Sequence, residues 1–596
     1  MTKYDWDLEH LLEGSTVEKL FEEYVNDFKK IIAMYPNFYK TKVNFKKWID
    51  ANEKLGILGN KLSNYISNKA NENIIDPVWI GWGQKINLIL NELSTTLADF
   101  DNAVIKNKKL IQSYLKDKDL SSHQRGYDLI FRLEQHILSP EIEKVLHKLS
   151  VADGGVGVAF TTLTDSDLKF RSAKDSKGKE HEIKTASDAS LLLKNPDRTL
   201  RKNTWINFHS AYDQYRNTLS QTLYYTYLDF NASAKVCNFK DYIDSTTFAD
   251  EIDEKFILNL YEQVASFKDI HKQYQDKVKS LLKKQLKLKE IEPWDMSVDL
   301  SKTQIKVDIE QAKKMVLEGL KPLGEDYCSH IKQAFDENWI SWLPKQNKLT
   351  GAYSIGGVKG LDKFYILTNF NNTIDAVMTI AHELGHSMNS YYSVKHQKVY
   401  PETCIFYAEI ASICVETLMV LYFLTKYKNN KDFVNLYLKH LFDTFFASTT
   451  RQIIFSNFEY EANKLVNAGQ PFVPEVLKDL YLKMIAKYEG WDEKKINKYK
   501  KEPYSYSSST ILRIPHFYAG NFYVYKYAIG QICGLIMANK IYQGNKAAVK
   551  NFIKFLSSGS SLSPLDTVKL LGIDLTKKEP YQETKVILSS LLKKFK

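Results

Sequence analysis

The pentapeptide His382-Glu383-Leu384-Gly385-His386 constrains this chain more than any other stretch. Apolar residues recur at helical spacing over residues 374–388, which predicts a one-sided helix with Thr373 as its N-cap. Two histidines four residues apart project from one face of such a helix. Histidines so placed typically grip one zinc ion, with the intervening glutamate beside a water molecule on the metal. The sequence therefore predicts a metal site on this helix.

The alternative is a chance match on a core helix whose two histidines are satisfied by ordinary contacts. The chain has only 13 histidines, so an accidental match to this pattern is rare. A catalytic metal also requires a third protein ligand, because zinc hydrolases keep three protein ligands and one open position. The downstream sequence can be searched for that ligand.

Three glutamates downstream are candidates for the third ligand. Glu409 and Glu416 lie in an apolar run that extends to Leu424, where an unpaired carboxylate is costly to bury. They are seven residues apart and share a helical face, so one can bind the metal while the other supports a ligating histidine. Glu402, in the loop after Pro401, is the third candidate. Spacing does not decide among them, and a salt-bridged helix explains Glu416 equally well.

The pentapeptide followed by Glu409-x-x-Ser412-x-x-x-Glu416 resembles the M3 family of zinc metallopeptidases. The resemblance covers nearly the whole chain, and its further matches are Tyr4–Leu8, His136–Ser139 with Glu141 and Glu143, Gly351–Ser354, Asn369 and Arg513–Tyr518. This combination is far more specific than the pentapeptide alone.

The resemblance implies one Zn²⁺ per chain. Its ligands would be His382, His386 and Glu409. Glu383 would be the catalytic carboxylate, and Glu416 would support a ligand from behind. The family often has a further histidine three residues past His386, where this chain has Asn389. That position is not a ligand position, so the departure bears on substrate contacts and on support of the site.

The segment around residues 516–525 supplies the other candidate catalytic groups. Amide hydrolysis develops negative charge on the carbonyl oxygen, so the site needs hydrogen-bond donors there. Similar enzymes place a histidine and two tyrosines in this region, although Asn521 stands where an ungapped alignment expects a tyrosine. We choose His516, Tyr518 and Tyr525, with Tyr523 in reserve. Tyrosine packing on a core helix is the alternative for half of these tyrosines.

Charge and cysteine usage exclude several classes of protein. The net charge of +11 comes from lysines spread through the chain, and the densest run, Lys283–Lys289, fits the solvated end of a helix. A nucleic-acid binder would concentrate such charge on one face, so we expect no nucleic-acid partner. The five cysteines are odd in number and form no Cys-x-x-Cys pair, which favours reduced thiols and a cytoplasmic location.

Apolar runs are also short. The N-terminus has no apolar signal-peptide core, and no uncharged run reaches the roughly 20 residues of a membrane span. We therefore expect no membrane association. The sequence does not indicate an oligomeric state.

Helical patterns dominate the chain. Ser15 and Glu18 predict a capping box at one helix start, and Pro140 fits the first turn of another helix. A glycine- and threonine-rich stretch at 151–185 interrupts this pattern, with strands expected at 168–171 and 180–184 as a β-hairpin. Its glycines are not a phosphate loop, because no Gly-Lys-Ser/Thr follows.

A second non-helical region spans residues 351–372, just before the metal helix. Residues 364–368 are aromatic and β-branched, which predicts a strand. If this strand lies at a sheet edge, it can pair with an extended peptide through main-chain hydrogen bonds. An ordinary small flap is the alternative.

Together these features predict a mostly α fold with two helical lobes around a deep substrate channel and a small β flap next to the metal helix. The expected domains are residues 1–190, with the hairpin at 168–184, and a catalytic domain at 191–596. The expected function is a cytoplasmic zinc endopeptidase that cuts short oligopeptides; the restriction to short substrates comes from the resemblance.

Two other functions compete with this one. An exopeptidase would need a basic residue to bind a terminal carboxylate, and Arg513 is the nearby candidate. The other is a peptide-binding or chaperone-like helical protein with a vestigial site. The presence of all four site residues argues against it, because nothing would keep them in place: His382, Glu383, His386 and Glu409.

Overall fold

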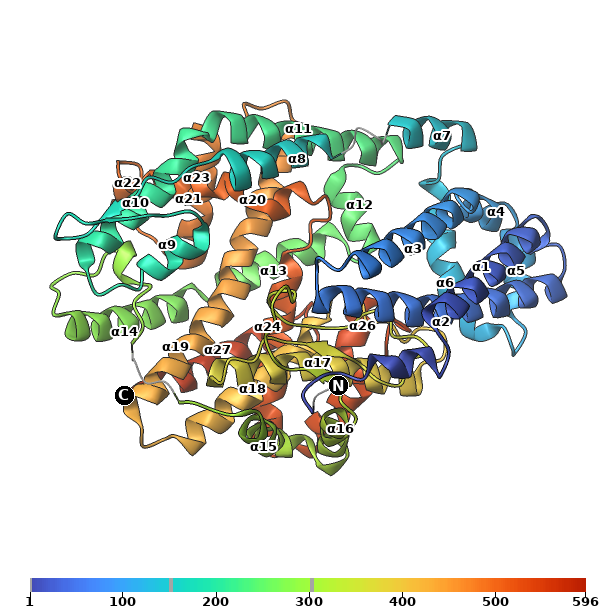
Figure 1. Cartoon of the computed structure of the whole chain (residues 1–596). Helices are drawn as coiled ribbons and strands as arrows, with labels where there is room; N and C mark the ends of the chain where they lie inside the picture. The colour runs from blue at the N-terminus through green and yellow to red at the C-terminus, as the bar shows by residue number, and fades with distance from the viewer. Residues whose placement is uncertain (1–2, 150–153, 301–304) are drawn as a thin grey trace. The chain divides into compact units, whose positions relative to one another are not determined.

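The structure, a computed structural model, describes residues 3–149, 154–300 and 305–596. Helices dominate it and the strands are short, which confirms the mostly α fold (Figure 1). Contacts divide the chain into two units. Unit 1 comprises Met1–Pro140, Gln304–Tyr422 and Cys533–Asp574, and unit 2 comprises Glu141–Thr303, Phe423–Ile532 and Leu575–Lys596. Segments of the two units alternate along the chain. The predicted domains, residues 1–190 and 191–596, are instead each continuous in sequence, and this division stays a prediction.

The helices of each unit follow. Unit 1 holds α1 (Val17–Met34), α2 (Lys42–Glu72), α3 (Pro77–Thr96), α4 (Phe100–Lys106), α5 (Lys108–Leu115), α6 (Gln124–Arg132), α15 (Ile309–Leu320), α16 (Glu325–Asp336), α17 (Ile374–His396), α25 (Lys546–Leu556) and α26 (Pro564–Lys569). Unit 2 holds all but the first residue of α7 (Pro140–Leu149), then α8 (Gly155–Thr161), α9 (Ala186–Leu192), α10 (Arg198–Gln214), α11 (Arg216–Val236), α12 (Tyr242–Ala249), α13 (Glu254–Ala265), α14 (Lys268–Leu286), α19 (Lys431–Ser448), α20 (Thr450–Asn467), α21 (Pro474–Glu489), α22 (Glu493–Tyr499), α23 (Tyr506–Ser509) and α27 (Glu579–Leu592). Two helices, α18 (Glu409–Lys426) and α24 (Tyr525–Tyr542), have residues in both units.

Helix starts follow the expected chemistry with one exception. Thr373 caps α17, and its side chain accepts a hydrogen bond from the backbone N–H of Ala376. Helix α7 begins at Pro140 as predicted. The capping box predicted from Ser15 is wrong, because α1 begins one residue later and Thr16 is its N-cap.

The glycine-rich stretch is more helical than its composition indicates. Residues 151–153 lie outside the described residues, but Gly155–Thr161 forms α8 and Thr162–Asp167 continues as a π-helix. Gly154 has a φ of 79°, a backbone conformation that glycine adopts without strain, and it starts this helix. The predicted break is therefore wrong for residues 155–167.

A hairpin follows that stretch. Its strands, β1 (Ala173–Lys174) and β2 (Glu180–His181), pair antiparallel. The first strand lies later than the predicted 168–171, because Asp175 closes a tight turn by accepting hydrogen bonds from the backbone N–H groups of Lys177 and Lys179.

A three-stranded sheet lies beside α17 in unit 1. Its order is β3 (Ile340–Ser341), β5 (Ile366–Leu367) and β4 (Tyr353–Ser354), with β5 parallel to β3 and antiparallel to β4. The strand predicted at 364–368 is thus present. It is fully buried in the middle of the sheet, so the expectation that it forms an edge is wrong. Both β4 and β5 contact α17, and β4 is the edge strand next to it.

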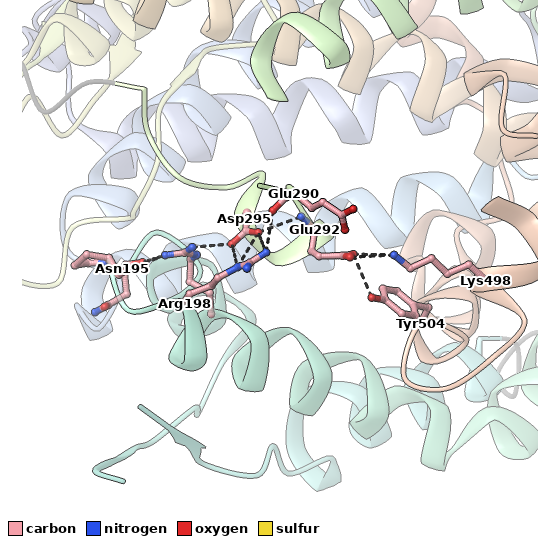
Figure 2. A network of polar contacts seen from close by, with 9 residues as sticks. Asn195, Arg198, Glu290, Glu292, Asp295, Lys498 and Tyr504 are labelled. Carbon is pink, nitrogen blue, oxygen red and sulfur yellow. Dashed lines mark hydrogen bonds and ion pairs between the residues drawn. The ribbon is translucent and has the colours of Figure 1, made fainter. Parts of the chain in front are cut away.

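A buried polar network fixes one corner of unit 2 (Figure 2). Asp295 is fully buried and accepts hydrogen bonds from Arg198 and Arg201 of α10. Burial raises the pKa of the Asp295 carboxyl, but the two arginines hold it below its usual value. Glu292 extends the network to Lys498 and Tyr504, so the chain around residue 295 is joined to α10, to α22 and to the segment after α22.

One prediction about the surface is confirmed. The lysine run at 283–289 covers the last turn of α14 and the residues after it, where the lysine side chains are exposed. Within the part of the chain that the structure describes, every helix is too short or too polar to cross a membrane.

Candidate metal centre

Helix α17 lies beside α18 (Figure 1), and at Gly385 it packs closely against the first turn of α18. A Cβ atom added to Gly385 would lie 2.7 Å from the Cα atom of Ser412, well inside normal contact distance. Glycine is therefore required for this close approach of the two helices. The approach brings Glu409, the first residue of α18, next to His382 and His386.

Three side chains converge at this crossing. The Oε2 atom of Glu409 lies 3.5 Å from Nε2 of His382 and 3.5 Å from Nε2 of His386. One atom from each of the three residues lies within 4.8 Å of the other two, and no other group of three such side chains occurs among the described residues. Two imidazole nitrogens and one carboxylate oxygen are a donor set that catalytic zinc accepts, with one position left for water. The residues present therefore fit the predicted ion.

Glu416 supports this set from behind. Its Oε2 atom lies 3.1 Å from Nδ1 of His382, so it fixes the ring with Nε2 facing Glu409. The hydroxyl of Ser412 donates a hydrogen bond of 2.8 Å to Oε2 of Glu409 and fixes that carboxylate as well. The two carboxylates thus lie in different positions, Glu409 beside both histidines and Glu416 at the other ring nitrogen of His382.

Glu402 has a different task. Its carboxylate accepts hydrogen bonds from the backbone N–H groups of Val358 and Lys359, and it is not part of the cluster of three. Asn389, at the position where the family often has histidine, donates a hydrogen bond to Thr403. It therefore ties α17 to the segment before α18.

The cluster is strongly coupled in charge. Burial raises the pKa of the Glu409 carboxyl, but the hydrogen bond and charge of His386, with His382 and Ser412, lower it to about 2. Burial lowers the pKa of His382, but Glu416 and the other two carboxylates raise it to about 9. Burial raises the pKa of Glu383 above its usual value. The cluster therefore keeps an ionised carboxylate beside a protonated imidazole, which a metal ion would have to deprotonate on binding.

A pocket of about 450 Å³ opens in front of these residues. One wall is β4 and the turn after it, and the other wall is formed by α17 and the start of α18. The backbone N–H of Ile355 bonds to Tyr365 of the neighbouring strand, so the backbone groups of Ser354 point to the opposite side, away from β5. The Ser354 N–H lies close enough to Glu383 to lower the pKa of its carboxyl. Among the described residues no strand pairs with this side of β4, so an edge of the sheet borders the three converging side chains.

The predicted oxyanion donors all lie in unit 2, where their surroundings differ. His516 is in a 3₁₀ turn at Pro515–Tyr518, and its Nδ1 atom is hydrogen-bonded to the hydroxyl of Tyr523. The Tyr518 ring stacks on Phe160 at 3.8 Å, and its hydroxyl lies within hydrogen-bond distance of backbone carbonyls. Tyr525 is fully buried and donates to Asp250. The structure thus joins His516 to the reserve candidate Tyr523, and the catalytic roles of all four remain predictions.

Sequence reasoning missed the groups that hold β4 in place. The hydroxyl of Ser387 on α17 lies 2.9 Å from that of Ser354 on β4. Four of the asparagines on α2 form hydrogen bonds to the segment 353–359: Asn60, Asn64, Asn68 and Asn71. The one available signal was their spacing, because it places all four on one face of a helix.

Comparison with known proteins agrees with this geometry. A family model described as Peptidase family M3 matches residues 191–587, and one described as Oligopeptidase F matches residues 107–170. The chain belongs to peptidase family M3. This membership confirms the resemblance read from the motifs and makes the chain a peptidase.

Individual M3 relatives cover the whole chain. An oligoendopeptidase F homolog of Mycoplasma pneumoniae is 40% identical over 595 residues, which are 99% of this chain and 97% of that protein. A crystal structure from Chlamydophila abortus matches with a TM-score of 0.88 at 26% identity, covering 100% of this chain and 98% of that one. The oligoendopeptidase-F structure from Enterococcus faecium shares the fold, with a TM-score of 0.71 at 22% identity and 97% coverage of both chains.

Proposed function

We propose that this chain is a zinc-dependent endopeptidase that hydrolyses internal bonds of short oligopeptides. The observation that carries the proposal is the convergence of three ligand atoms within 4.8 Å beside a pocket with a free strand edge. Membership in family M3 supports the peptidase chemistry. His382, His386 and Glu409 would hold one zinc ion.

Glu383 is the proposed general base. A bound zinc ion would lower the pKa of a water molecule and polarise the carbonyl of the scissile bond. Glu383 directly follows His382 on α17 and lines the same pocket as both histidines, so its carboxylate could take the proton of that water and pass it to the departing amine. Glu416 keeps the ring of His382 aligned throughout. An extended peptide would pair with the outer side of β4 through main-chain hydrogen bonds, a mode that binds many sequences with little selectivity.

Stabilisation of the oxyanion is assigned to the segment 516–525. His516, Tyr518 and Tyr525 are the donors implied by family resemblance. The Tyr525 hydroxyl is engaged by Asp250, whereas Tyr523 is partly exposed and already joined to His516. These surroundings favour His516 and Tyr523 as the working pair.

The restriction to short substrates would be steric. This restriction is implied by the family resemblance, and it fits relatives named oligoendopeptidase F. The five cysteines form no disulfide in the structure and fit a cytoplasmic peptidase that turns over peptides.

Three measurements test the proposal. Metal analysis of the purified protein should find one zinc per chain, and Glu383→Gln should remove nearly all hydrolysis while the metal remains bound. An internally quenched peptide with both ends blocked should still be cut, whereas an exopeptidase would leave it intact. Unchanged turnover by Glu383→Gln, or a protein without zinc, would refute the enzyme mechanism.

A further inference from the structure

Helix α2 carries a row of asparagines that faces the metal pocket's edge strand. Asn60, Asn64, Asn68 and Asn71 are spaced four, four and three residues apart, so they lie on one face of the helix. Asparagine is unfavourable within a helix, because its side-chain amide competes for the hydrogen bonds of the backbone. Four on one face therefore indicate that their side chains serve a contact. In the structure all four bind the segment 353–359, far away in sequence but in the same unit.

Two of these asparagines hold the turn that follows β4. The Nδ2 atom of Asn64 donates to the carbonyl oxygens of Gly356 at 3.1 Å and Gly357 at 3.2 Å. The Nδ2 atom of Asn60 donates to the carbonyl oxygen of Lys359 at 3.0 Å. Gly357 has a φ of 65°, and a Cβ atom there would lie 3.1 Å from Oδ1 of Asn60. The turn is thus shaped to fit against α2.

The other two hold the strand itself. The hydroxyl of Tyr353 on β4 donates to Oδ1 of Asn68 at 2.7 Å and accepts from Nδ2 of Asn71 at 2.8 Å. From another segment, Glu402 accepts hydrogen bonds from the backbone N–H groups of Val358 at 2.9 Å and of the next residue at 3.1 Å. The segment is therefore held from two other parts of the chain by side chains that complete its backbone hydrogen bonds.

The held segment is the wall of the metal pocket. Ser354 lies between Tyr353 and the turn, its backbone points away from β5, and its N–H lies near Glu383. β4 is paired on one side only, to the short strand β5. Two-residue strands have few ladder hydrogen bonds to fix their position, so contacts from outside the sheet must supply it.

We propose that Asn60 and Asn64 are positioning residues for the substrate: through the turn at 356–359 they set the free edge of β4 at the distance from Glu383 at which an extended peptide is bound. This inference rests on the proposed endopeptidase function. Neither asparagine contacts the metal ligands or the reacting atoms. They act on peptide binding through the backbone of β4.

The test separates binding from chemistry. In Asn64→Ala and Asn60→Ala we expect KM for a quenched peptide to rise about five- to tenfold, with kcat within twofold of wild type. The reason is that β4 would bind the peptide equally in the ground state and in the transition state. In a Glu383→Gln background, which binds peptide without cutting it, the Kd of a fluorescein-labelled peptide should rise by the same factor. Zinc content and zinc affinity should equal those of the wild type.

Asn52→Ala is the matched control. Asn52 lies on the same helix, and its amide donates only to the carbonyl of Trp48 one turn earlier, at 2.8 Å. We expect its KM and peptide Kd to be unchanged. Melting temperatures of all variants show whether α2 remains folded, and the milder Asn64→Ser replaces Asn64→Ala if that variant does not fold.

The outcomes distinguish the two proposals. Unchanged KM and peptide Kd in both asparagine variants overturn the positioning role and leave the endopeptidase function intact. The positioning role is also overturned if Asn52→Ala weakens peptide binding equally, or if Asn64→Ala loses zinc. The substitutions would then disturb the whole unit and not the position of β4. Wild-type turnover by Glu383→Gln would instead refute the endopeptidase mechanism itself.

Discussion

Gly385→Ala tests whether the close approach of α17 and α18 builds the metal site. The new methyl carbon would lie 2.7 Å from Cα of Ser412 and 3.0 Å from the carbonyl oxygen of Ala411, both backbone atoms that cannot rotate away. Carbon atoms in contact prefer about 3.5–4.0 Å, so the helices must separate by roughly 1 Å. Glu409 would move away from the histidines by a similar distance, several times the ~0.2 Å tolerance of zinc–ligand bonds.

The effects on metal binding and on stability should therefore differ in size. Overpacking costs about 1–3 kcal/mol, while alanine gains about 1 kcal/mol over glycine within a helix, so the metal-free protein should lose no more than about 2 kcal/mol. Zinc affinity should fall by about 100-fold or more. Competition with a chromophoric chelator measures the zinc Kd, and urea unfolding of the metal-free protein measures stability.

Gly56→Ala is the control for this experiment. Gly56 lies within α2, and a Cβ atom there meets nothing within 4 Å, so alanine should stabilise the helix by up to about 1 kcal/mol and leave zinc affinity unchanged. A zinc Kd for Gly385→Ala within threefold of wild type would show that the helix crossing does not set the ligand geometry.

Three further predictions concern other charged and aromatic groups. Glu416→Gln should weaken zinc binding about 10- to 100-fold in calorimetric titration, because His382 loses its ionic support; unchanged affinity would remove Glu416 from the site. Tyr523→Phe should lower kcat and leave KM nearly constant, whereas Tyr525→Phe should mainly lower the melting temperature, and the reverse pattern would restore Tyr525 as the donor. Burial raises the pKa of Glu459 from 4.5 to about 8. Between these two pH values the folded chain therefore keeps a proton on Glu459 that the unfolded chain has lost. Stability should therefore fall as pH rises through that window, by at most about 1.4 kcal/mol per unit, and Glu459→Gln should flatten the slope in urea unfolding.

The sequence was sufficient for the helix that carries the histidines. Its period, its N-cap Thr373 and the spacing of His382 and His386 are all local properties, and each is present in the structure. The apolar run after Glu409 also identified two carboxylates that needed partners. Local pattern and the cost of burying charge therefore determine most of the candidate site.

The remaining features depend on contacts between distant segments. Spacing left Glu402 and Glu409 both open, and only the resemblance chose Glu409. The physical reason for that choice is the helix crossing at Gly385, which no spacing rule gives. The strand at 366–367 was found, but its place in the middle of the sheet depends on pairing with residues 340–341 and 353–354. The hydroxyl of Tyr525 is engaged by Asp250, a partner 275 residues away in sequence.

The two helices that meet at the metal cluster are consecutive in the chain. An ion held between His386 and Glu409 would cross-link only a short loop, so it would restrict the unfolded chain little. The two helices are also joined directly, by the close packing of Gly385 against Ser412. Chelation should therefore leave a folded, inactive protein that regains activity on adding zinc, in contrast to small zinc domains that unfold when their metal is removed.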